Sequence, residues 1–225
     1  MKTLLLWDID GTLLASSGAG LRALSTALRQ VFGREDTLAG LDWSGRTDRY
    51  IIAQIFERCQ IPDTPENRDR YVDGYAEALP GEMARSNVLP GVLEILKAAD
   101  ARPDIVQGLL TGNLRRGAEL KLGHHGLWDF FAFGAFADDS PNRNELGPHA
   151  LRRAAEHAGA VFQPDRVWII GDTPHDIACG RVIGAKTLAL PTGHHPAEEL
   201  AAHQPTALLT DLSDTAAFWK LIEAR

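Results

Sequence analysis

The sequence lacks the features that would place a protein in a membrane or hold it together with disulfides. Its 225 residues contain no apolar run of about 18 residues, the length that a transmembrane helix needs. Only two cysteines occur, Cys59 and Cys179, and they stand far apart with no metal-ligand spacing. The apolar start of the chain is broken early by Asp8 and Asp10, unlike a signal peptide. We therefore expect a cytoplasmic protein with no disulfide framework and no membrane partner.

Positive charge is also scarce. The chain carries 23 Lys and Arg against 30 Asp and Glu, a formal net charge of −7. Binding of nucleic acid normally needs a basic face, so we expect no nucleic-acid partner. An anionic substrate remains compatible with this charge, because a bound divalent cation reverses the local field. The length suits one full α/β domain with a smaller insertion.

The chain begins with an apolar run, residues 4–7, that ends abruptly at two carboxylates. A short apolar run with such a boundary predicts a strand buried on both faces of a parallel sheet. Side chains alternate along a strand, so Asp8 and Asp10 should point the same way, and Gly11 permits a tight turn after them. Two adjacent carboxylates repel each other unless a cation or a shared proton intervenes. The pair therefore indicates a site rather than a structural strand end.

The rest of the chain divides into a helical segment and an alternating segment. Residues 16–85 carry only helical patterns, with helices expected at 21–31, from Ser44 or Thr47, and at 66–79. Beyond Pro90, helices alternate with apolar strands expected at 104–110, 131–135, 166–170, 186–190 and 207–209. This alternation predicts an α/β fold with a doubly wound parallel sheet. We expect an α/β core domain from residues 1–15 and 86–225, with an inserted all-helical domain, residues 16–85.

Polar residues stand where several of these strands end. Thr111 follows the strand at 104–110, Asp172 follows the strand at 166–170, and Asp8 and Asp10 follow the first strand. Ligands of parallel α/β sheets bind beyond the carboxyl ends of the strands. Three strands should therefore deliver carboxylates and a hydroxyl to one edge of the sheet.

These motifs resemble those of the haloacid-dehalogenase-like superfamily of hydrolases, most of which are magnesium-dependent phosphatases. Asp8-Ile9-Asp10-Gly11-Thr12 matches the first motif, Thr111 the second, and Gly171-Asp172-Thr173-Pro174-His175-Asp176 the fourth. The helical insertion resembles the cap of phosphoglycolate phosphatases and their relatives. The resemblance implies a Rossmann-like core with a helical cap. It also implies a Mg²⁺-dependent phosphomonoester hydrolase that forms an aspartyl-phosphate on a small phosphorylated metabolite.

Roles for individual carboxylates follow from the resemblance and have physical reasons. Asp8 would attack phosphorus, and Asp10 would protonate the leaving group and later activate water. Mg²⁺ would be held by Asp8, Asp172 and the backbone carbonyl of Asp10, because this ion prefers a few carboxylate oxygens. Asp176 would orient these ligands, or it would only be a favourable carboxylate at a helix N-terminus.

The phosphoryl group would be bound by a strand-end loop and by a cation. The loop donors are Thr111, Gly112 and Asn113. The family usually places a lysine before the fourth motif, but none lies between Lys121 and Lys186. Arg143 stands at about that place and can clamp a phosphoryl group, although it is not equivalent to lysine. A surface position for Arg143 is the alternative.

In the cap, Arg46 lies in a Gly-Arg segment resembling the one that faces the active site in related caps. We expect it to contact the non-reacting end of the substrate, with a solvated arginine beside Asp48 as the alternative. A sugar-phosphate mutase and a catalytically silent binding or regulatory protein remain alternative functions. Dehalogenation is disfavoured because Asp10 is present, and phosphonate cleavage because residues 16–85 contain no lysine. The expected partner is a small phosphomonoester, and the chain is expected to be a monomer or homodimer.

Overall fold

The computed structural model describes residues 2–224, and its centre is a parallel sheet of six strands. The strand order is β5-β4-β1-β6-β7-β8, and every neighbouring pair runs parallel. The strands are β1 (Thr3–Trp7), β4 (Ile105–Leu110), β5 (Gly134–Ala135), β6 (Val167–Gly171), β7 (Lys186–Ala189) and β8 (Ala207–Leu208). The doubly wound α/β fold predicted from the sequence is confirmed.

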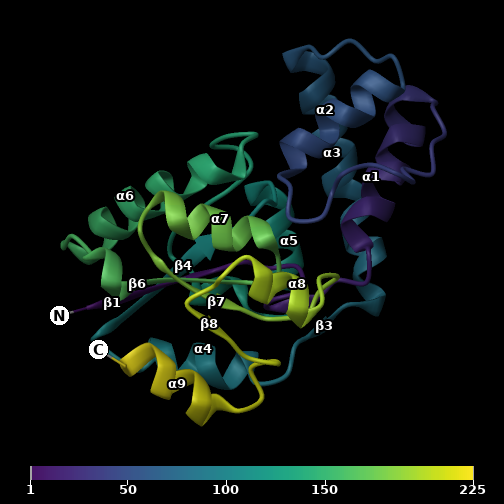
Figure 1. Ribbon diagram of the computed structural model, residues 1–225. Helices are drawn as coiled ribbons and strands as arrows, with labels where there is room; N and C mark the ends of the chain where they lie inside the picture. The colour runs from purple at the N-terminus through teal and green to yellow at the C-terminus, as the bar shows by residue number, and fades with distance from the viewer. Residues whose placement is uncertain (1, 225) are drawn as a thin grey trace.

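Helices cover both faces of this sheet (Figure 1). One face carries α4 (Val92–Asp100) and α9 (Thr215–Glu223), and the other carries α6 (Leu146–Ala158) and α7 (Pro174–Val182). Every residue of β1 is buried, as predicted. Trp7 stacks on Phe218 of α9 with ring centroids 5.7 Å apart, whereas Leu4 and Leu6 join the core cluster that contains Leu146 of α6. Strand β1 thus contributes side chains to the hydrophobic core on both faces of the sheet. The remaining core helices are α5 (Arg115–His124) and α8 (Ala197–Ala202).

A separate helical block stands at one end of the sheet (Figure 1). It consists of α1 (Ala19–Phe32), α2 (Asp48–Arg58) and α3 (Pro65–Glu82). Local chemistry sets its helix ends: Gly33 in a left-handed conformation ends α1, and the Thr47 hydroxyl accepts from Tyr50 N at the start of α2. These helices lie within residues 16–85, and we propose that this segment is the cap domain.

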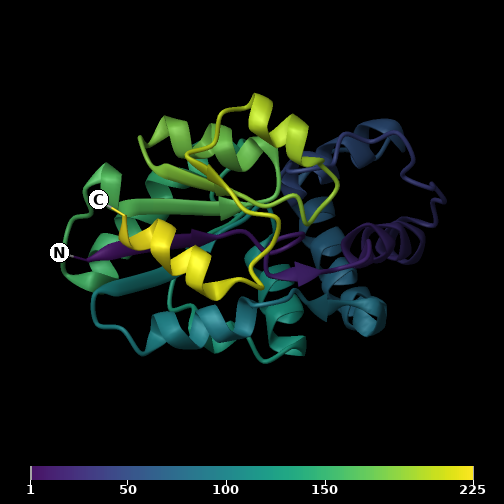
Figure 2. The ribbon, with the colours of Figure 1, turned by 60° about the horizontal axis from the view of Figure 1, so that its bottom comes forward.

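The two connections between block and sheet run side by side. Their strands β2 (Leu14–Ala15) and β3 (Asn87–Val88) form an antiparallel pair. Figure 2 shows the block beyond one end of the strands, whereas the start of β1 and the end of α9 lie toward the opposite end. Because β1 begins at that opposite end, its carboxyl end points toward the helical block. The other strands run parallel to β1, so the block faces the carboxyl ends of all of them.

Some elements differ from the expectations. The strand predicted at 131–135 is reduced to Gly134–Ala135, and residues 131–133 form an irregular segment between it and a 3₁₀ turn at Trp128–Phe130. Helices α8 and α9 and the pair β2–β3 were not predicted. Further 3₁₀ turns lie at Met83–Arg85, Arg143–Glu145 and Pro164–Arg166. No helix within residues 2–224 has the length and apolar character that crossing a membrane requires.

Candidate active site

Three buried carboxylates meet at the carboxyl ends of β1 and β6. Asp8 follows β1, Asp172 follows β6, and Asp176 lies in the first turn of α7. One carboxylate oxygen from each lies within 4.8 Å of the others, and none of the three residues is more than 4 % exposed. The sequence predicted that Asp8 and Asp172 would lie at one edge of the sheet, and they lie together because β1 and β6 are neighbours in it.

Burial and mutual repulsion make these carboxylates hard to ionise together. Burial raises the pKa of Asp8 to about 6, although the charge of Arg143 works against this rise. The pKa of Asp172 is raised well above its usual value by burial and by the charges of Asp8 and Asp176. Such a set of carboxylate oxygens fits a hard divalent cation such as Mg²⁺, which would relieve the repulsion.

Two glycines leave room for the Asp172 carboxylate. A Cβ atom on either Gly11 or Gly193 would collide with its oxygens. Gly11 also has a positive φ of 84°, which favours glycine and lets the chain turn directly after Asp10. Larger residues in these loops would displace the carboxylate, so both glycines preserve the geometry of the cluster.

Arg143 lies at the centre of the carboxylate cluster. Its Nη2 is 3.0 Å from Asp8 Oδ1 and 2.5 Å from Asp176 Oδ1, and its Nη1 donates to the Gly45 carbonyl at 3.2 Å. Burial lowers the pKa of Arg143, but Asp176 and Asp8 outweigh that effect and raise it. Among residues 2–224, its Nε has no hydrogen-bond partner although it is buried.

Asp176 is committed to its own helix. Its Oδ2 accepts hydrogen bonds from Thr173 N at 3.1 Å and from Thr173 Oγ1 at 2.7 Å, completing a capping box at the start of α7. Its Oδ1 accepts from Arg143. Asp176 thus stabilises the helix N-terminus and holds Arg143 beside Asp8, while its predicted role toward the metal ligands stays a prediction.

Asp10 lies apart from that cluster and has its own partners. Its Oδ2 accepts from Lys121 Nζ at 2.6 Å and from Asn113 Nδ2 at 2.7 Å, while its Oδ1 is hydrogen-bonded to Ser16 Oγ. Burial raises the pKa of Asp10, but these three neighbours outweigh burial and lower it. Sequence reasoning missed Lys121. Its place on the buried face of α5, beside Ala118 and within an otherwise amphipathic helix, was the available signal.

The loop after β4 brings the predicted phosphate-binding residues under the cap. Thr111 Oγ1 accepts from Asn113 N at 3.3 Å and from Asn113 Nδ2 at 2.9 Å. The Gly112 carbonyl accepts from Asp48 N at 2.7 Å, and a Cβ on Gly112 would collide with the Arg46 carbonyl. The backbone of residues 44–48, which we call the cap loop, thus lies directly against the loop after β4.

A family model for haloacid dehalogenase-like hydrolases matches residues 5–181. The chain belongs to this family. It is 27 % identical over 205 residues to a phosphoglycolate phosphatase of Rhodospirillum rubrum, covering 86 % of this chain and 81 % of that protein. It is also 27 % identical over 209 residues to an N-acetylmuramic acid 6-phosphate phosphatase of Pseudomonas aeruginosa, covering 92 % and 89 %. A hydrolase from Pseudomonas syringae shares the fold with a TM-score of 0.73 and 21 % identity, covering 99 % and 100 %.

In this member of the haloacid dehalogenase-like family, the Arg46 side chain is held within the cap. Its guanidinium donates to Asp42 Oδ2 at 2.8 Å through Nε and lies 4.8 Å from the centre of the Tyr50 ring. The backbone of Arg46 reaches the site, whereas its charge is paired with Asp42. The predicted contact with substrate stays a prediction, and it requires the pair to open.

Several contacts hold the cap loop over the strand ends. Thr47 Oγ1 donates to the Pro141 carbonyl at 2.7 Å, and Leu114 N donates to Asp48 Oδ2 at 2.8 Å. On the other side, Ser44 Oγ and His195 Nε2 are hydrogen-bonded at 2.8 Å. The structure therefore shows the cap loop docked on both the β4 and the β7 side of the site.

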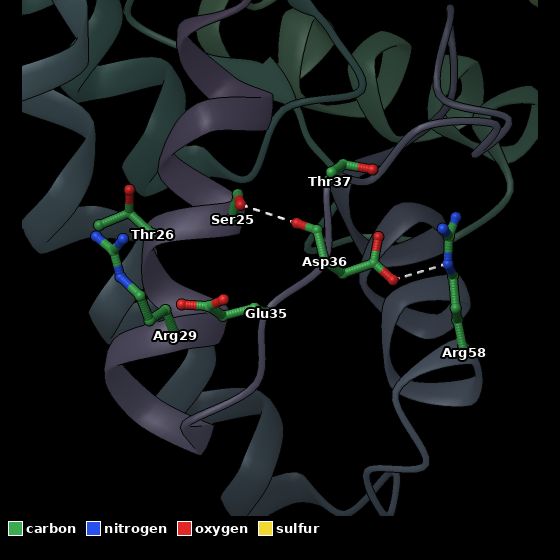
Figure 3. Close-up of a pocket in the computed structure, with 7 residues that line it drawn as sticks. All are labelled: Ser25, Thr26, Arg29, Glu35, Asp36, Thr37 and Arg58. Atoms are coloured by element: carbon green, nitrogen blue, oxygen red, sulfur yellow. Dashed lines mark hydrogen bonds and ion pairs between the residues drawn. The ribbon is translucent and has the colours of Figure 1, made fainter.

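A polar pocket lies elsewhere, within the helical block. Its lining residues come from α1, from the loop after it and from α2, as Figure 3 shows. Asp36 pairs with Arg58 at 2.8 Å, and its carbonyl accepts from Ser25 Oγ at 3.0 Å. These contacts tie the loop to both helices. None of the lining residues belongs to the carboxylate cluster.

Proposed function

We propose that the protein is a Mg²⁺-dependent phosphatase that works through an aspartyl-phosphate on Asp8. Its family is one of hydrolases and its matched relatives are phosphatases, so the chain is a hydrolase acting on phosphate monoesters. The observation that carries the proposal is the separate placement of the two aspartates. Asp8 lies among Arg143, Asp172 and Asp176, whereas Asp10 lies with Lys121 and Asn113.

In the first half of the reaction, an Asp8 carboxylate oxygen attacks phosphorus and the ester oxygen leaves. Both groups are anionic, so the attack needs positive charge. Arg143 supplies a full charge beside Asp8 and has Nε left to donate to a phosphoryl oxygen. Mg²⁺ would be held by Asp8, Asp172 and the Asp10 backbone carbonyl, and when bound it would neutralise charge on the phosphoryl oxygens.

Asp10 would act as the general acid and the general base. It would give its proton to the leaving oxygen in the first half and accept a proton from water in the second. In that second half, the water oxygen bonds to phosphorus, and Asp8 is released. The loop after β4 would donate hydrogen bonds to the phosphoryl group from Thr111 Oγ1, the Gly112 amide and Asn113.

The substrate that we propose is a small phosphorylated metabolite, of the phosphoglycolate type. The cap loop packs directly on the loop after β4, with the Arg46 carbonyl against Gly112. A docked cap of this kind suits a small substrate enclosed between cap and core. The relative named phosphoglycolate phosphatase supports the same class.

The test is phosphate release from a panel of small phosphomonoesters with Mg²⁺ or with a chelator. The expected result is hydrolysis of at least one ester with Mg²⁺ and none with the chelator. Asp8→Asn is the control, because it keeps the shape and removes the nucleophile. Transfer of phosphate between positions of a sugar phosphate, without release, would instead support a mutase. No turnover of any ester would support a binding protein.

A further inference from the structure

Lys121 is a buried cation that the proposed reaction has not used. It projects from α5, the helix that begins directly after the loop at 111–113. The residue is only 3 % exposed. Gly20 of α1 lies over it, since a Cβ there would be 3.5 Å from Lys121 Nζ. A buried ammonium is costly unless it is paired and hydrogen-bonded, so its partners are informative.

Those partners are Asp10 and Asn113. Lys121 Nζ lies 2.6 Å from Asp10 Oδ2 and 2.6 Å from Asn113 Oδ1. An ammonium can only donate, so the amide oxygen of Asn113 must face Lys121 and its NH₂ group must face away. That NH₂ group donates to the same Asp10 Oδ2 at 2.7 Å. Lys121 thus fixes one carboxylate oxygen directly and again through Asn113.

We propose that Lys121 is the positioning residue for Asp10, and that it makes Oδ1 the oxygen that carries the transferred proton. Two donors occupy Oδ2, which leaves no place for a proton there. Among the residues that the structure describes, Oδ1 is hydrogen-bonded only to Ser16 Oγ, a hydroxyl that can accept as well as donate. The Asp10 side chain is 38 % exposed, whereas that of Lys121 is 4 % exposed, so the carboxylate is accessible from outside and the ammonium is enclosed.

This role differs from that of Arg143. Arg143 pairs with Asp8 Oδ1 at 3.0 Å and reaches it from the turn before α6, whereas Lys121 reaches Asp10 from α5. Each aspartate of the first motif therefore has its own buried cation from a different element. Asp8 and Asp10 carry like charges that repel each other. A separate cation for each carboxylate holds the two apart and offsets this repulsion.

A positioning role and a purely structural role of Lys121 predict different rate losses for esters with different leaving groups. In the first half of the proposed reaction, the bond from Asp8 to phosphorus forms and the ester P–O bond breaks. The proton on Asp10 Oδ1 passes to the leaving oxygen. An alkoxide needs that proton, whereas p-nitrophenolate leaves without one. A merely structural tie would affect both esters alike.

The experiment compares kcat/KM of the wild type and Lys121→Met on p-nitrophenyl phosphate and on an alkyl phosphate that the wild type hydrolyses. For the alkyl ester we expect a loss of ~100-fold, and for p-nitrophenyl phosphate a loss below ~10-fold, as for impaired general acid catalysis. Lys121→Arg should restore part of the alkyl activity. The matched control is Lys97→Met on the exposed side of α4, which should change neither ester.

Equal losses on both esters, or no loss on either, would overturn the positioning role. Thermal unfolding shows whether the variants fold. If Lys121→Met does not fold, Lys121→Gln replaces it in the comparison of kcat/KM on the two esters. The inference rests on the proposed function, and the two fail differently. A wild type that hydrolyses no alkyl phosphate refutes the proposed function, whereas an active wild type with equal losses refutes only the role of Lys121.

Discussion

The guanidinium of Arg143 and the carboxylate of Asp8 form a buried ion pair, with Nη2 and Oδ1 3.0 Å apart. Both side chains are 5 % exposed, so water screens their interaction only slightly. The same guanidinium binds Asp176, which in turn caps α7. One arginine therefore links the strand-end aspartate to the helix that begins within the fourth motif.

Arg143→Ala should damage both catalysis and stability. It would remove the charge beside Asp8 and leave Asp8 and Asp176 buried without their partner, a change that typically costs about 3–5 kcal/mol. Arg143→Lys should recover part of kcat/KM, since the charge returns without the planar fork. Steady-state kinetics and chemical denaturation measure the two effects. Arg152→Ala, at an exposed position of α6, is the control. Unchanged kinetics in Arg143→Ala would show that another residue binds the phosphoryl group.

Asp10→Asn should lower turnover by roughly 10²–10⁴-fold, the usual range for a lost general acid and base. The amide keeps the size of the side chain, and its oxygen can still accept from Lys121 and Asn113. The unfolding temperature should also fall, because the neutral amide leaves the buried Lys121 ammonium without a paired charge. Initial rates with saturating Mg²⁺ measure the effect. Turnover close to that of the wild type would show that protons travel by another route.

Mg²⁺ should stabilise the protein more at pH 7.5 than at pH 5. The pKa of Asp8 is raised to about 6 and that of Asp172 is raised well above its usual value, mainly by burial, so both hold protons more tightly when folded than when unfolded. In a chelator, this contribution to stability is present at low pH and is lost as the pH rises through about 6. Mg²⁺ competes with these protons, so its stabilising effect grows over the same range.

The measurement is the shift in unfolding temperature between chelator and excess Mg²⁺ at the two pH values. Asp172→Asn is the control, because it removes a proposed ligand and should abolish most of the shift. A shift that is equal at both pH values, or larger at pH 5, contradicts a cation site at these carboxylates.

Arg46→Ala should reduce kcat/KM for phosphoglycolate far more than for p-nitrophenyl phosphate. The reason is that Arg46 would meet the substrate's carboxylate after leaving Asp42. Asp42→Asn should have the opposite effect on phosphoglycolate, because it frees the guanidinium. The exposed Arg68, also paired within the cap, supplies the control Arg68→Ala. Equal effects of Arg46→Ala on both esters would remove Arg46 from substrate selection.

The carboxylate cluster was predictable because strand ends obey simple rules. Asp8 and Asp172 end apolar runs, and parallel neighbours bring such ends together. Arg143 was found only by its place in the chain, since nothing local distinguishes a buried arginine from an exposed one. Lys121 could not be found this way. Its partner Asp10 lies 111 positions away, and a lysine in a helix is usually solvated.

Elements of the fold were predictable to a similar degree. The buried strands and the three helices of the block follow from periodicity and from caps such as Thr47. The pair β2–β3 has two residues in each strand and depends on contacts between chain segments far apart in sequence. Periodicity cannot show so short a pairing. The direction of the Arg46 side chain likewise depends on Asp42, which only the folded loop places beside it.

Acid-quenched mass spectrometry tests the central claim most directly. The wild type and Asp10→Asn are mixed with Mg²⁺ and p-nitrophenyl phosphate, whose leaving group needs no proton from Asp10, quenched within the first turnover, and digested. The account predicts a peptide that carries one phosphoryl group on Asp8, accumulating in Asp10→Asn because the base that activates water is missing, and absent from Asp8→Asn. Phosphate release by the wild type with no phosphorylated Asp8 in either protein, or steady turnover by Asp8→Asn, would contradict the account.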